Sequence, residues 1–477
     1  MANIDTSQHG QRGQPAASKL SFRYQTVAMV LVAIYIALHY LILVSQSTYG
    51  PSFIDELACL LLLPFAVLAF IHAGLKVATI GLIGYWICLI VGMILGPDQG
   101  VPQPLSALVA AALDTKVAVM AFAFVWLFKR LDRPEAVFNV IFFTFIAIAI
   151  IDLPFVGLDY LRGGSSLRGA HLVVKAGLVQ PMGLFGNHTE TSWLFTIAAF
   201  SSAVLYKARR KMHYLLLCAL FTGVVFAVLS IKEMFACIIG LIVLLRPPKA
   251  GFFSLLFSLS GVGGAIFLFL IYTPIGNSLL EHMSMFTGMS RIETVRSGMF
   301  DASIKIAATH FPLGTGGGTF GSAPSYQYGY SYVYYTYGLN TLYGGSRELP
   351  RFLQDIFWPK ILGEGGVLGF AFYATFFVAI LTPLFRIRSK TRGRGDMLQA
   401  FCIANFILVF AISTASAPLT NELLLFVTGV SLGYGMGGVR TGGQSSRQTS
   451  ARARRTEPLR TPDTSGDITG EGGVRPS

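Results

Sequence analysis

Charge is scarce in this chain of 477 residues: 12% of the residues are charged, whereas 53% are hydrophobic. A soluble domain carries about 25% charged residues, so this composition excludes an ordinary globular enzyme. The mean hydropathy of +0.61 agrees. The apolar residues gather in runs of roughly 15 to 22, which is the length of a membrane-spanning helix. The sequence therefore predicts an all-α polytopic membrane protein.

Cysteine is also rare, and all five cysteines lie inside apolar runs: Cys59, Cys88, Cys218, Cys237 and Cys402. Cysteines in that setting are small buried hydrophobes rather than disulfides or metal ligands. The sequence has no Cys/His cluster with zinc spacing, no Walker motif and no dinucleotide fingerprint. We therefore expect neither a metal nor a cofactor, and a nucleotide-driven pump is disfavoured.

About twelve apolar runs can be counted along the chain. They cover roughly 27–44, 57–71, 77–95, 105–128, 136–156, 191–206, 214–229, 231–245, 251–272, 361–385, 397–414 and 421–436. The N-terminal residues 1–25 and the tail 437–477 are polar, and we expect both to be disordered because they bury too little apolar surface. Residues 26–436 form the expected transmembrane domain of about twelve helices.

The basic residues predict the orientation of this domain. With a cytoplasmic N-terminus, 25 of the 36 Lys and Arg residues fall on the cytoplasmic side, as the positive-inside rule expects. The net charge of +13 is then an orientation signal and not a sign of nucleic-acid binding. Both termini become cytoplasmic, and two long loops, about 157–190 and 273–360, face the opposite side. Substrates used there must arrive already activated, because ATP and nucleotide sugars are cytoplasmic.

The first outer loop contains Arg162 and Arg168 and ends where Glu190 precedes an apolar run. Arginine binds anions in a bidentate manner, so both arginines are candidate anion contacts. Glu190, beside His188, is a candidate acid or base at the membrane surface. The alternative is an ordinary helix start, with Thr189 as N-cap and Glu190 favouring the helix dipole.

Lys232 and Glu233 begin a short apolar run, which must carry both charges at or below the interface in order to span. Charges at depth are costly and tend to line cavities. Lys232 is therefore a candidate anion contact with Glu233 as its partner. An interfacial ion pair with a snorkelling stem is the alternative. Asp114 and Lys116 pose the same question, and we expect a structural role for them.

The second outer loop opens with Arg291 and Arg296, two further candidate anion contacts. An amphipathic stretch over 297–308 predicts a helix. The glycine-rich residues 314–321 follow, and their N–H groups could form an anion-binding concavity or serve a flexible hinge.

A tyrosine tract comes next, with eight of the chain's 19 tyrosines in 18 residues: Tyr326, Tyr328, Tyr330, Tyr332, Tyr334, Tyr335, Tyr337 and Tyr343. Tyrosine combines a flat apolar face with a polar tip, which suits stacking on sugar rings. Tyr330, Tyr334 and Tyr335 are the candidate glycan contacts. Interfacial anchoring is the alternative. The alternating spacing predicts a strand or an extended lid.

In the order of its motifs, over roughly residues 20–436, the chain resembles the superfamily of O-antigen ligases and Wzy-type polysaccharide polymerases. A Gly-Leu-Phe-Gly-Asn element (183–187) precedes one apolar run, and Ser230 with Lys232 opens another. Arg291 or Arg296 precedes Pro-Leu-Gly-Thr-Gly (312–316). The long loop then ends at Glu-x-Gly-x-x-Gly, which begins at Glu364.

The resemblance implies a metal-independent glycosyltransferase in a bacterial inner membrane, with its active site on the periplasmic face. Such proteins transfer a glycan from undecaprenyl pyrophosphate to an acceptor hydroxyl. Arginines stabilise the pyrophosphate, and a loop residue activates the hydroxyl. The implied partners are the lipid-linked oligosaccharide and membrane lipid, with chain-length regulator and export proteins as further candidates.

The chain also departs from the ligase pattern. The ligases place His-Asn shortly before the Glu-x-Gly-x-x-Gly element, where this chain has Asp355-Ile356. Their Ser-Arg pair is changed to Ser230-Ile231-Lys232, and an Arg expected near Gln180 is missing. The missing His counts against a ligase and leaves Asp355 as a candidate base beside Glu190 and Glu364. Glu364 could instead be a buried partner of a basic loop residue or a helix-start carboxylate.

We expect a polysaccharide polymerase that joins lipid-linked repeat units of a capsule, exopolysaccharide or O-antigen. The alternatives are an O-antigen ligase of the same fold and, in a different class, a twelve-helix transporter or lipid-linked glycan flippase.

Overall fold

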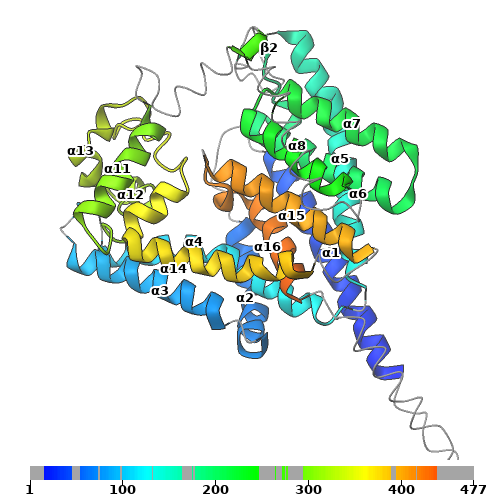
Figure 1. Ribbon diagram of the computed structural model, residues 1–477, viewed down its shortest axis with the longest axis horizontal. Coiled ribbons are helices and arrows are strands. Elements are labelled where there is room, and N and C mark those ends of the chain that lie inside the picture. The colour runs from blue at the N-terminus through cyan, green and yellow to red at the C-terminus, as the bar shows by residue number, and fades with distance from the viewer. Residues whose placement is uncertain are drawn as a thin grey trace, which may run out of the picture. The chain divides into compact units, whose positions relative to one another are not determined.

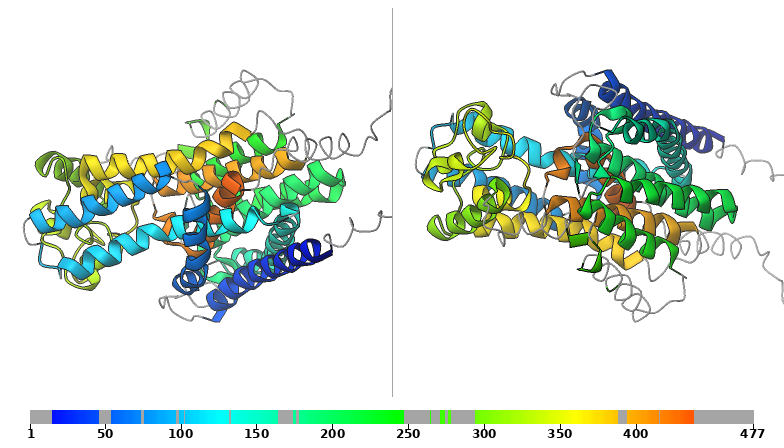
Figure 2. Two further views of the ribbon diagram at one scale, coloured as in Figure 1. Left: turned by 90° about the horizontal axis from the view of Figure 1, so that it is seen from below. Right: turned by 90° about the horizontal axis from the view of Figure 1, so that it is seen from above.

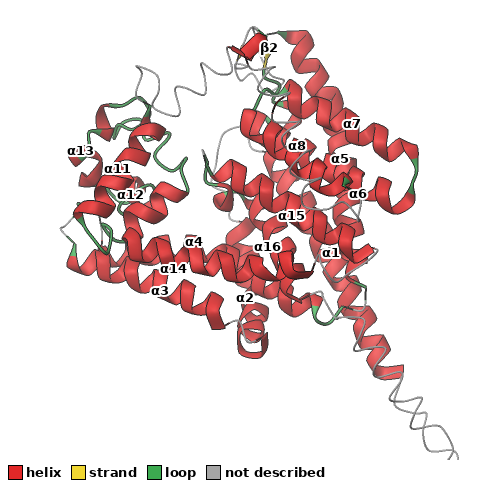
Figure 3. Ribbon diagram, in the orientation of Figure 1, coloured by secondary structure: helices red, strands yellow, loops and turns green. Residues whose placement is uncertain are grey.

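The computed structural model describes residues 15–45, 54–73, 76–96, 99–101, 103–131, 133–163, 174–175, 178–246, 264, 271–273, 276–277, 294–387, 394–414 and 416–437. Helices account for most of these residues (Figure 3). The longer ones are α1 Pro15–Ser45, α2 Ile54–Ala73, α3 Lys76–Leu95, α4 Gln103–Phe128, α5 Pro134–Arg162, α6 His188–Arg209, α7 Met212–Ala227, α8 Ile231–Leu245, α11 Val295–Thr309, α14 Trp358–Ile387, α15 Arg394–Ser413 and α16 Glu422–Gly437.

The prediction of an all-α membrane protein is confirmed at this level. Within the described residues, seven helices are long and apolar enough to cross a membrane, namely α1 to α5, α14 and α15. Two shorter apolar helices are α7 and α16. Helices α1–α8 and α14–α16 each overlap one predicted apolar run. Most of the predicted run 251–272 lies outside the described residues, and the total of twelve spans stays a prediction.

Helix α6, which follows the first predicted loop, lies at the centre of one group of packed helices. Every residue from Glu190 to Leu205 is buried, and α6 contacts α5, α7, α8 and α15. Small side chains allow such close packing between helices. At Gly240 of α8, an added Cβ would lie 2.3 Å from the Phe200 ring. The approach of α8 to α6 therefore depends on that glycine.

Helices α3, α4 and α14 run side by side in a second group (Figure 2). Helix α14 packs along α3, and α4 packs along both α2 and α16. The chain between α5 and α6 includes β1 Val174–Lys175 and β2 Leu178–Val179, an antiparallel pair, and the 3-10 helix η1 Gly183–Phe185. These strands are two residues each, so the helical character of the fold is unchanged.

Residues 294–357 form a helical region with a small apolar core of its own. It contains α11, α12 Pro324–Gln327, α13 Tyr332–Thr336 and the 3-10 helix η2 Leu339–Thr341. Its core includes Met299, Ile306, Phe320 and Leu353. Figure 1 shows α11, α12 and α13 gathered beside the ends of α3 and α14. We refer to residues 294–357 as the cap region.

Two predictions concern the cap region, and one is confirmed while the other is wrong. The helix predicted over 297–308 is confirmed as α11, whose start is fixed by a capping box between Thr294 and Ser297. The strand or extended lid predicted over the tyrosine tract is wrong. The tract folds into α12 and α13 because its tyrosines divide between a buried core and the surface at helical spacing.

The glycine-rich segment 312–321 anchors the cap region on the helices. The N–H groups of Thr315 and Gly316 donate to the carbonyl oxygens of Gly363 and Glu364 at 3.0 and 3.1 Å. The N–H of Gly317 donates to Leu89 O of α3 at 3.1 Å. These groups are occupied and buried, so the segment forms neither the anion-binding concavity nor the flexible hinge that the sequence left open. We call it the glycine anchor.

The glycine anchor approaches the helices too closely for any side chain. Gly316 has a φ of +90°, and an added Cβ would lie 2.4 Å from the Met93 backbone. At Gly314 an added Cβ would lie 2.0 Å from Gly363 O. The facing helix α14 is itself interrupted at Gly366, where φ is 64° and ψ is −168°. Glycine is required on both sides of this contact.

The steric role of the anchor can be tested with Gly316→Ala and the matched control Gly338→Ala. Gly338 has a φ of +70° but nothing within 4 Å of an added Cβ. Both variants bear left-handed strain of about 1–2 kcal/mol. Only Gly316→Ala adds overpacking, of about 1–3 kcal/mol. We expect a clearly lower melting temperature for Gly316→Ala in thermal unfolding of the detergent-purified protein. Equal melting temperatures would contradict the anchor.

Candidate functional site

Two of the predicted site residues pair in the structure, and a third lies within electrostatic range of both, although all three are far apart in the sequence. Lys232 lies in the first turn of α8, Arg296 in the first turn of α11, and Asp355 three residues before α14. The Arg296 Nη2 atom donates to Asp355 Oδ2. Lys232 interacts electrostatically with both Arg296 and Asp355. The cap region therefore brings one cation and one carboxylate to a cation of the helix bundle.

Lys232 is held in place by groups on both sides. Its Nζ atom donates to Ser416 Oγ at 2.5 Å, in the connection between α15 and α16. It also lies 3.9 Å from Glu233 Oε1. Glu233 is fully buried and accepts hydrogen bonds from Trp193 Nε1, at 3.1 Å, and from Ser230 Oγ. Glu233 thus secures α8 against α6, while the Lys232 side chain stays 24% exposed.

The Arg296–Asp355 pair is also only partly covered, with side-chain exposures of 26% and 30%. The guanidinium lies over the ring of Phe352, 4.9 Å from its centroid. Burial, together with the neighbouring Asp355 carboxylate, raises the pKa of Tyr326 above its ordinary value. Its hydroxyl therefore stays protonated beside Asp355 at neutral pH. Arg296 is paired with one partly exposed carboxylate and Lys232 lies within electrostatic range of both, so an added anion would find attractive partners here.

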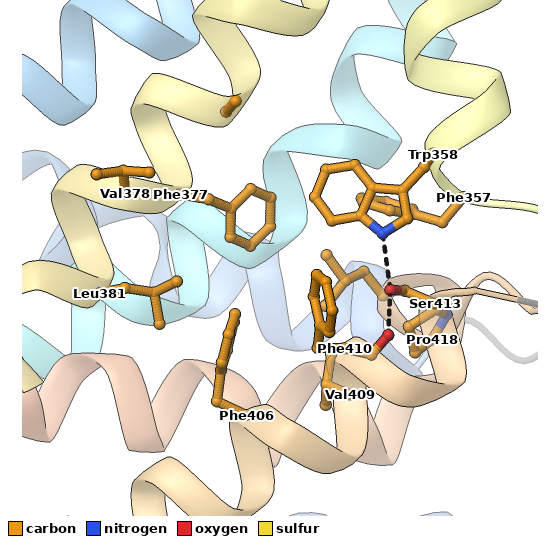
Figure 4. Close-up of a pocket in the computed structure, with 12 residues that line it drawn as sticks. Phe357, Trp358, Phe377, Val378, Leu381, Phe406, Val409, Phe410, Ser413 and Pro418 are labelled. Atoms are coloured by element: carbon orange, nitrogen blue, oxygen red, sulfur yellow. Dashed lines mark hydrogen bonds between the residues drawn. The ribbon is translucent and has the colours of Figure 1, made fainter. Parts of the chain in front are cut away.

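An apolar groove begins close to this cluster. A cavity of about 220 Å³ lies between α14, α15 and the 3-10 helix η3 Pro418–Thr420. Figure 4 shows the residues that line it. Trp358 Nε1 donates to Ser413 Oγ at 2.8 Å at one end of it. The other aromatic lining residues are Phe357, Phe377, Phe406 and Phe410.

The chain connects the groove to the charged cluster at two points. Phe357 follows Asp355 by two residues, and Ser413 precedes Ser416 by three. Because consecutive Cα atoms are 3.8 Å apart, these links keep the end of the groove within about 12 Å of the cluster. A second hollow of about 400 Å³ shares Val378 and Leu381 with the groove and extends along α14 to Phe385. A charged cluster and an apolar track thus lie next to each other.

Glu190 belongs to a different cluster, which the sequence did not predict. The Asn421 side chain donates to Glu190 Oε1 at 2.6 Å. His39 Nδ1 lies 2.8 Å from Glu422 Oε2, and His39 Nε2 lies 3.9 Å from Glu190 Oε2. His39 is 2% exposed. The signal was available, since an ionisable residue within an apolar run is a functional candidate by default.

The start of α6 also differs from the expected one. Asn187 is the N-cap, and its side chain accepts the Thr189 N–H at 2.9 Å. The predicted N-cap, Thr189, is therefore wrong by two residues. Glu190 does lie in the first turn, as expected.

Glu364 lies inside the contact between the glycine anchor and α14. It is fully buried, and its Oε1 atom accepts the Phe320 N–H at 3.1 Å and the Ser322 hydroxyl at 2.6 Å. One turn earlier, Lys360 donates to Asp114 Oδ1 at 2.6 Å. The structure therefore places Glu364 where it fastens the cap region rather than beside Asp355 and Arg296.

Asp114 and Lys116 are both paired within the helix packing. Asp114 accepts from Lys360 and, at 2.8 Å, from the Tyr85 hydroxyl. Lys116 donates to Asp55 Oδ2 at 2.6 Å and to Glu56. These contacts tie α4 to α14, α3 and α2, which agrees with the expected structural role.

The predicted glycan residues divide between core and surface. Tyr334 is fully buried, and its hydroxyl accepts the Gly321 N–H at 3.0 Å. Tyr330 is also buried and donates to Gly345 O. Tyr335 is 47% exposed. Of the three, Tyr335 alone presents a surface on which a ligand could stack.

The remaining predicted anion contacts are Arg162, Arg168 and Arg291. Arg162 is exposed at the last residue of α5. Arg168 and Arg291 lie outside the described residues. Within the part of the chain that the structure describes, no group of three or more His, Cys, Asp and Glu side chains could hold a metal ion.

Comparison with protein-family models and with curated proteins yields no match for this chain. The site is therefore interpreted from its own geometry.

Glu364→Ala distinguishes a structural from a catalytic role for this carboxylate. The variant leaves the Phe320 N–H and the Ser322 hydroxyl without their buried acceptor, and an unsatisfied buried group costs about 1–3 kcal/mol. We expect the melting temperature to fall by several degrees. Asp301→Ala is the control, since its exposed pair with Lys305 on α11 contributes at most a few tenths of a kcal/mol. An unchanged melting temperature with lost activity would instead favour a role in chemistry.

Proposed function

We propose that this protein is a polysaccharide polymerase of the inner membrane of a bacterium. In this proposal it transfers a glycan from undecaprenyl diphosphate to a sugar hydroxyl of another lipid-linked repeat unit, during synthesis of a capsule, exopolysaccharide or O-antigen. The observation that carries the proposal is the meeting of Lys232, Arg296 and Asp355 beside an aromatic groove.

The charged cluster suits a diphosphate. A guanidinium presents planar, paired donors that match phosphate oxygens, and an ammonium adds a second positive charge. Lys232 and Arg296 come from separate elements, so they can contact different phosphate groups of one substrate. Positive charge held in place before the reaction stabilises the negative charge that develops on the leaving group.

The groove suits the lipid portion of the same substrate. Its walls are aromatic and aliphatic, and it extends along α14 away from the charged end. A polyprenyl diphosphate is an anion joined to a long apolar chain. The charged cluster matches the diphosphate, the groove matches the apolar chain, and the two lie next to each other. The basic-residue distribution puts this site on the periplasmic side in our proposal.

Asp355 is the proposed base. In the ligand-free arrangement its carboxylate neutralises Arg296. When the diphosphate takes over Arg296, the Asp355 carboxylate becomes available to the acceptor hydroxyl. Asp355 removes the proton while the hydroxyl oxygen forms a bond to the anomeric carbon. The bond from that carbon to the diphosphate oxygen breaks, and the diphosphate leaves with the electron pair. The proton then passes from Asp355 to solvent.

The proposal is tested by elongation with purified protein in nanodiscs, supplied only with lipid-linked repeat units and a chelator. Polymer should form. Arg296→Ala and Lys232→Met should each lower kcat/KM by about tenfold to hundredfold, because each removes a charge-assisted contact of about 1.5–3 kcal/mol. Lys305→Ala, on the exposed side of α11, should leave elongation unchanged. Full activity in both cluster variants would refute the assignment. Transfer to lipid A–core in place of elongation would identify a ligase.

Asp355→Asn should separate chemistry from binding. The amide keeps the size of the side chain but cannot accept the proton, and a general base contributes about 10²–10⁴ to the rate. We expect kcat to fall by at least about a hundredfold, with KM unchanged or lower because Arg296 is released for the substrate. Steady-state elongation kinetics with matched protein amounts measure both. A rise in KM at constant kcat would show that Asp355 only positions Arg296.

A transporter is the second candidate, and the His39–Glu190–Glu422 cluster favours it. Buried ionisable groups on three helices are typical of proton pathways in transporters. Proton-driven uptake or lipid flipping by reconstituted vesicles, without elongation and lost in His39→Phe, would support this function. Elongation that persists in His39→Phe would argue against a role of the cluster in elongation.

A further inference from the structure

An aromatic pair of one half-buried and one exposed ring, Phe352 and Tyr343, extends from Arg296 toward the surface of the cap region. Arg296 lies over Phe352, whose ring centroid is 6.1 Å from that of Tyr343. Tyr343 is 73% exposed although it belongs to a chain segment with a packed core. Arg351 lies 5.7 Å from the Phe352 centroid. The series Arg296, Phe352, Tyr343 therefore joins the anion-binding cluster to an open tyrosine face.

The turn that carries Tyr343 is held firmly in place. Phe352 N–H donates to Gly344 O at 3.0 Å, and Tyr330 donates its hydroxyl proton to Gly345 O. Gly344 has a φ of +79°, and an added Cβ would lie 2.2 Å from the Phe352 ring. Two glycines and two hydrogen bonds thus fix the backbone on one side of Tyr343. A preorganised aromatic ring loses little conformational freedom when it binds a ligand.

We propose that Tyr343 and Phe352 form the subsite for the sugar that is bonded directly to the diphosphate. The inference rests on the proposed function, because the diphosphate at Arg296 and Lys232 defines where that sugar lies. The apolar face of the sugar ring stacks on Tyr343, and the tyrosine hydroxyl remains available for a hydrogen bond. Tyr330 and Tyr334 then act on the glycan indirectly. Tyr330 holds the Gly345 carbonyl, and Tyr334 fills the core of the cap region.

In this proposal the buried tyrosines of the tract support the cap region, and the exposed Tyr343 contacts the sugar. Sugar stacking needs an open ring face, which Tyr334 lacks. It also needs a fixed relation to the diphosphate, which the contact of Phe352 with Arg296 provides. Interfacial anchoring, the other common task of a surface tyrosine, needs no such relation. The two interpretations therefore differ in whether the attached sugar changes the affinity.

Binding in nanodiscs tests this difference with four probes: bare undecaprenyl diphosphate, and undecaprenyl diphosphate bearing one glucose, galactose or N-acetylglucosamine. At least one sugar should bind more tightly than the bare lipid. Tyr343→Ala should abolish that gain, roughly twofold to tenfold, and leave the affinity for the bare lipid unchanged. Tyr343→Phe should keep most of the gain. Tyr328→Ala, 45% exposed in the same tract, is the control and should behave like the unmodified protein.

Each of the other outcomes would contradict either the subsite or the proposed function. If Tyr343→Ala keeps the sugar-dependent gain, or if no sugar improves on the bare lipid, the subsite is wrong while the diphosphate site stands. If Tyr343→Ala weakens all four probes equally, Tyr343 is an anchor for lipid. If the bare lipid does not bind, or binds equally well to Arg296→Ala, the proposed function fails and the subsite fails with it.

Discussion

Backbone contact between the glycine anchor and helices α3 and α14 is the constraint on which the site depends. The cap region is attached to the bundle there, and α11 and the Asp355 segment leave from the two sides of this contact. Gly314 and Gly316 meet backbone atoms of α14 and α3 at distances that exclude any Cβ. Backbone at this spacing is rigid because no side chain can adjust. A shift of the anchor would move Arg296 and Asp355 together, away from Lys232.

The charged groups of the protein fall into two kinds that differ in burial. Lys360 with Asp114, and Lys116 with Asp55, are nearly enclosed and paired at 2.6 Å. Removing a partner there would leave an uncompensated buried charge, which costs several kcal/mol, so these pairs are fixed. Lys232, Arg296 and Asp355 remain about one quarter exposed. Their interactions are weaker and more easily exchanged, which suits the anion binding and release that we propose.

The sequence predicted the features that depend on local composition. Apolar runs located the helices, and the amphipathic pattern located α11. Chemistry and the motif resemblance selected Lys232, Arg296 and Asp355, which the structure brings together. The sequence could not show that Lys360 pairs with Asp114, because the two residues are 246 positions apart and no local pattern identifies such a partner. His39 was missed because its carboxylate neighbours come from α6 and α16. The tyrosine alternation was misleading because the nine residues from Tyr326 to Tyr334 are too few to distinguish a strand from short helices with one buried face.

In the proposed polymerase, the Arg296–Asp355 pair balances the charge of the site before a substrate binds. Two cations held at a partly apolar surface would repel each other, and Lys232 already experiences the charge of Arg296. Asp355 offsets that repulsion until a diphosphate, with more negative charge and matching geometry, replaces it at the guanidinium. The same replacement exposes the carboxylate at the moment when the donor is in place. Under the proposed function, substrate binding and base activation are a single exchange of partners, which would prevent Asp355 from acting before the leaving group is stabilised.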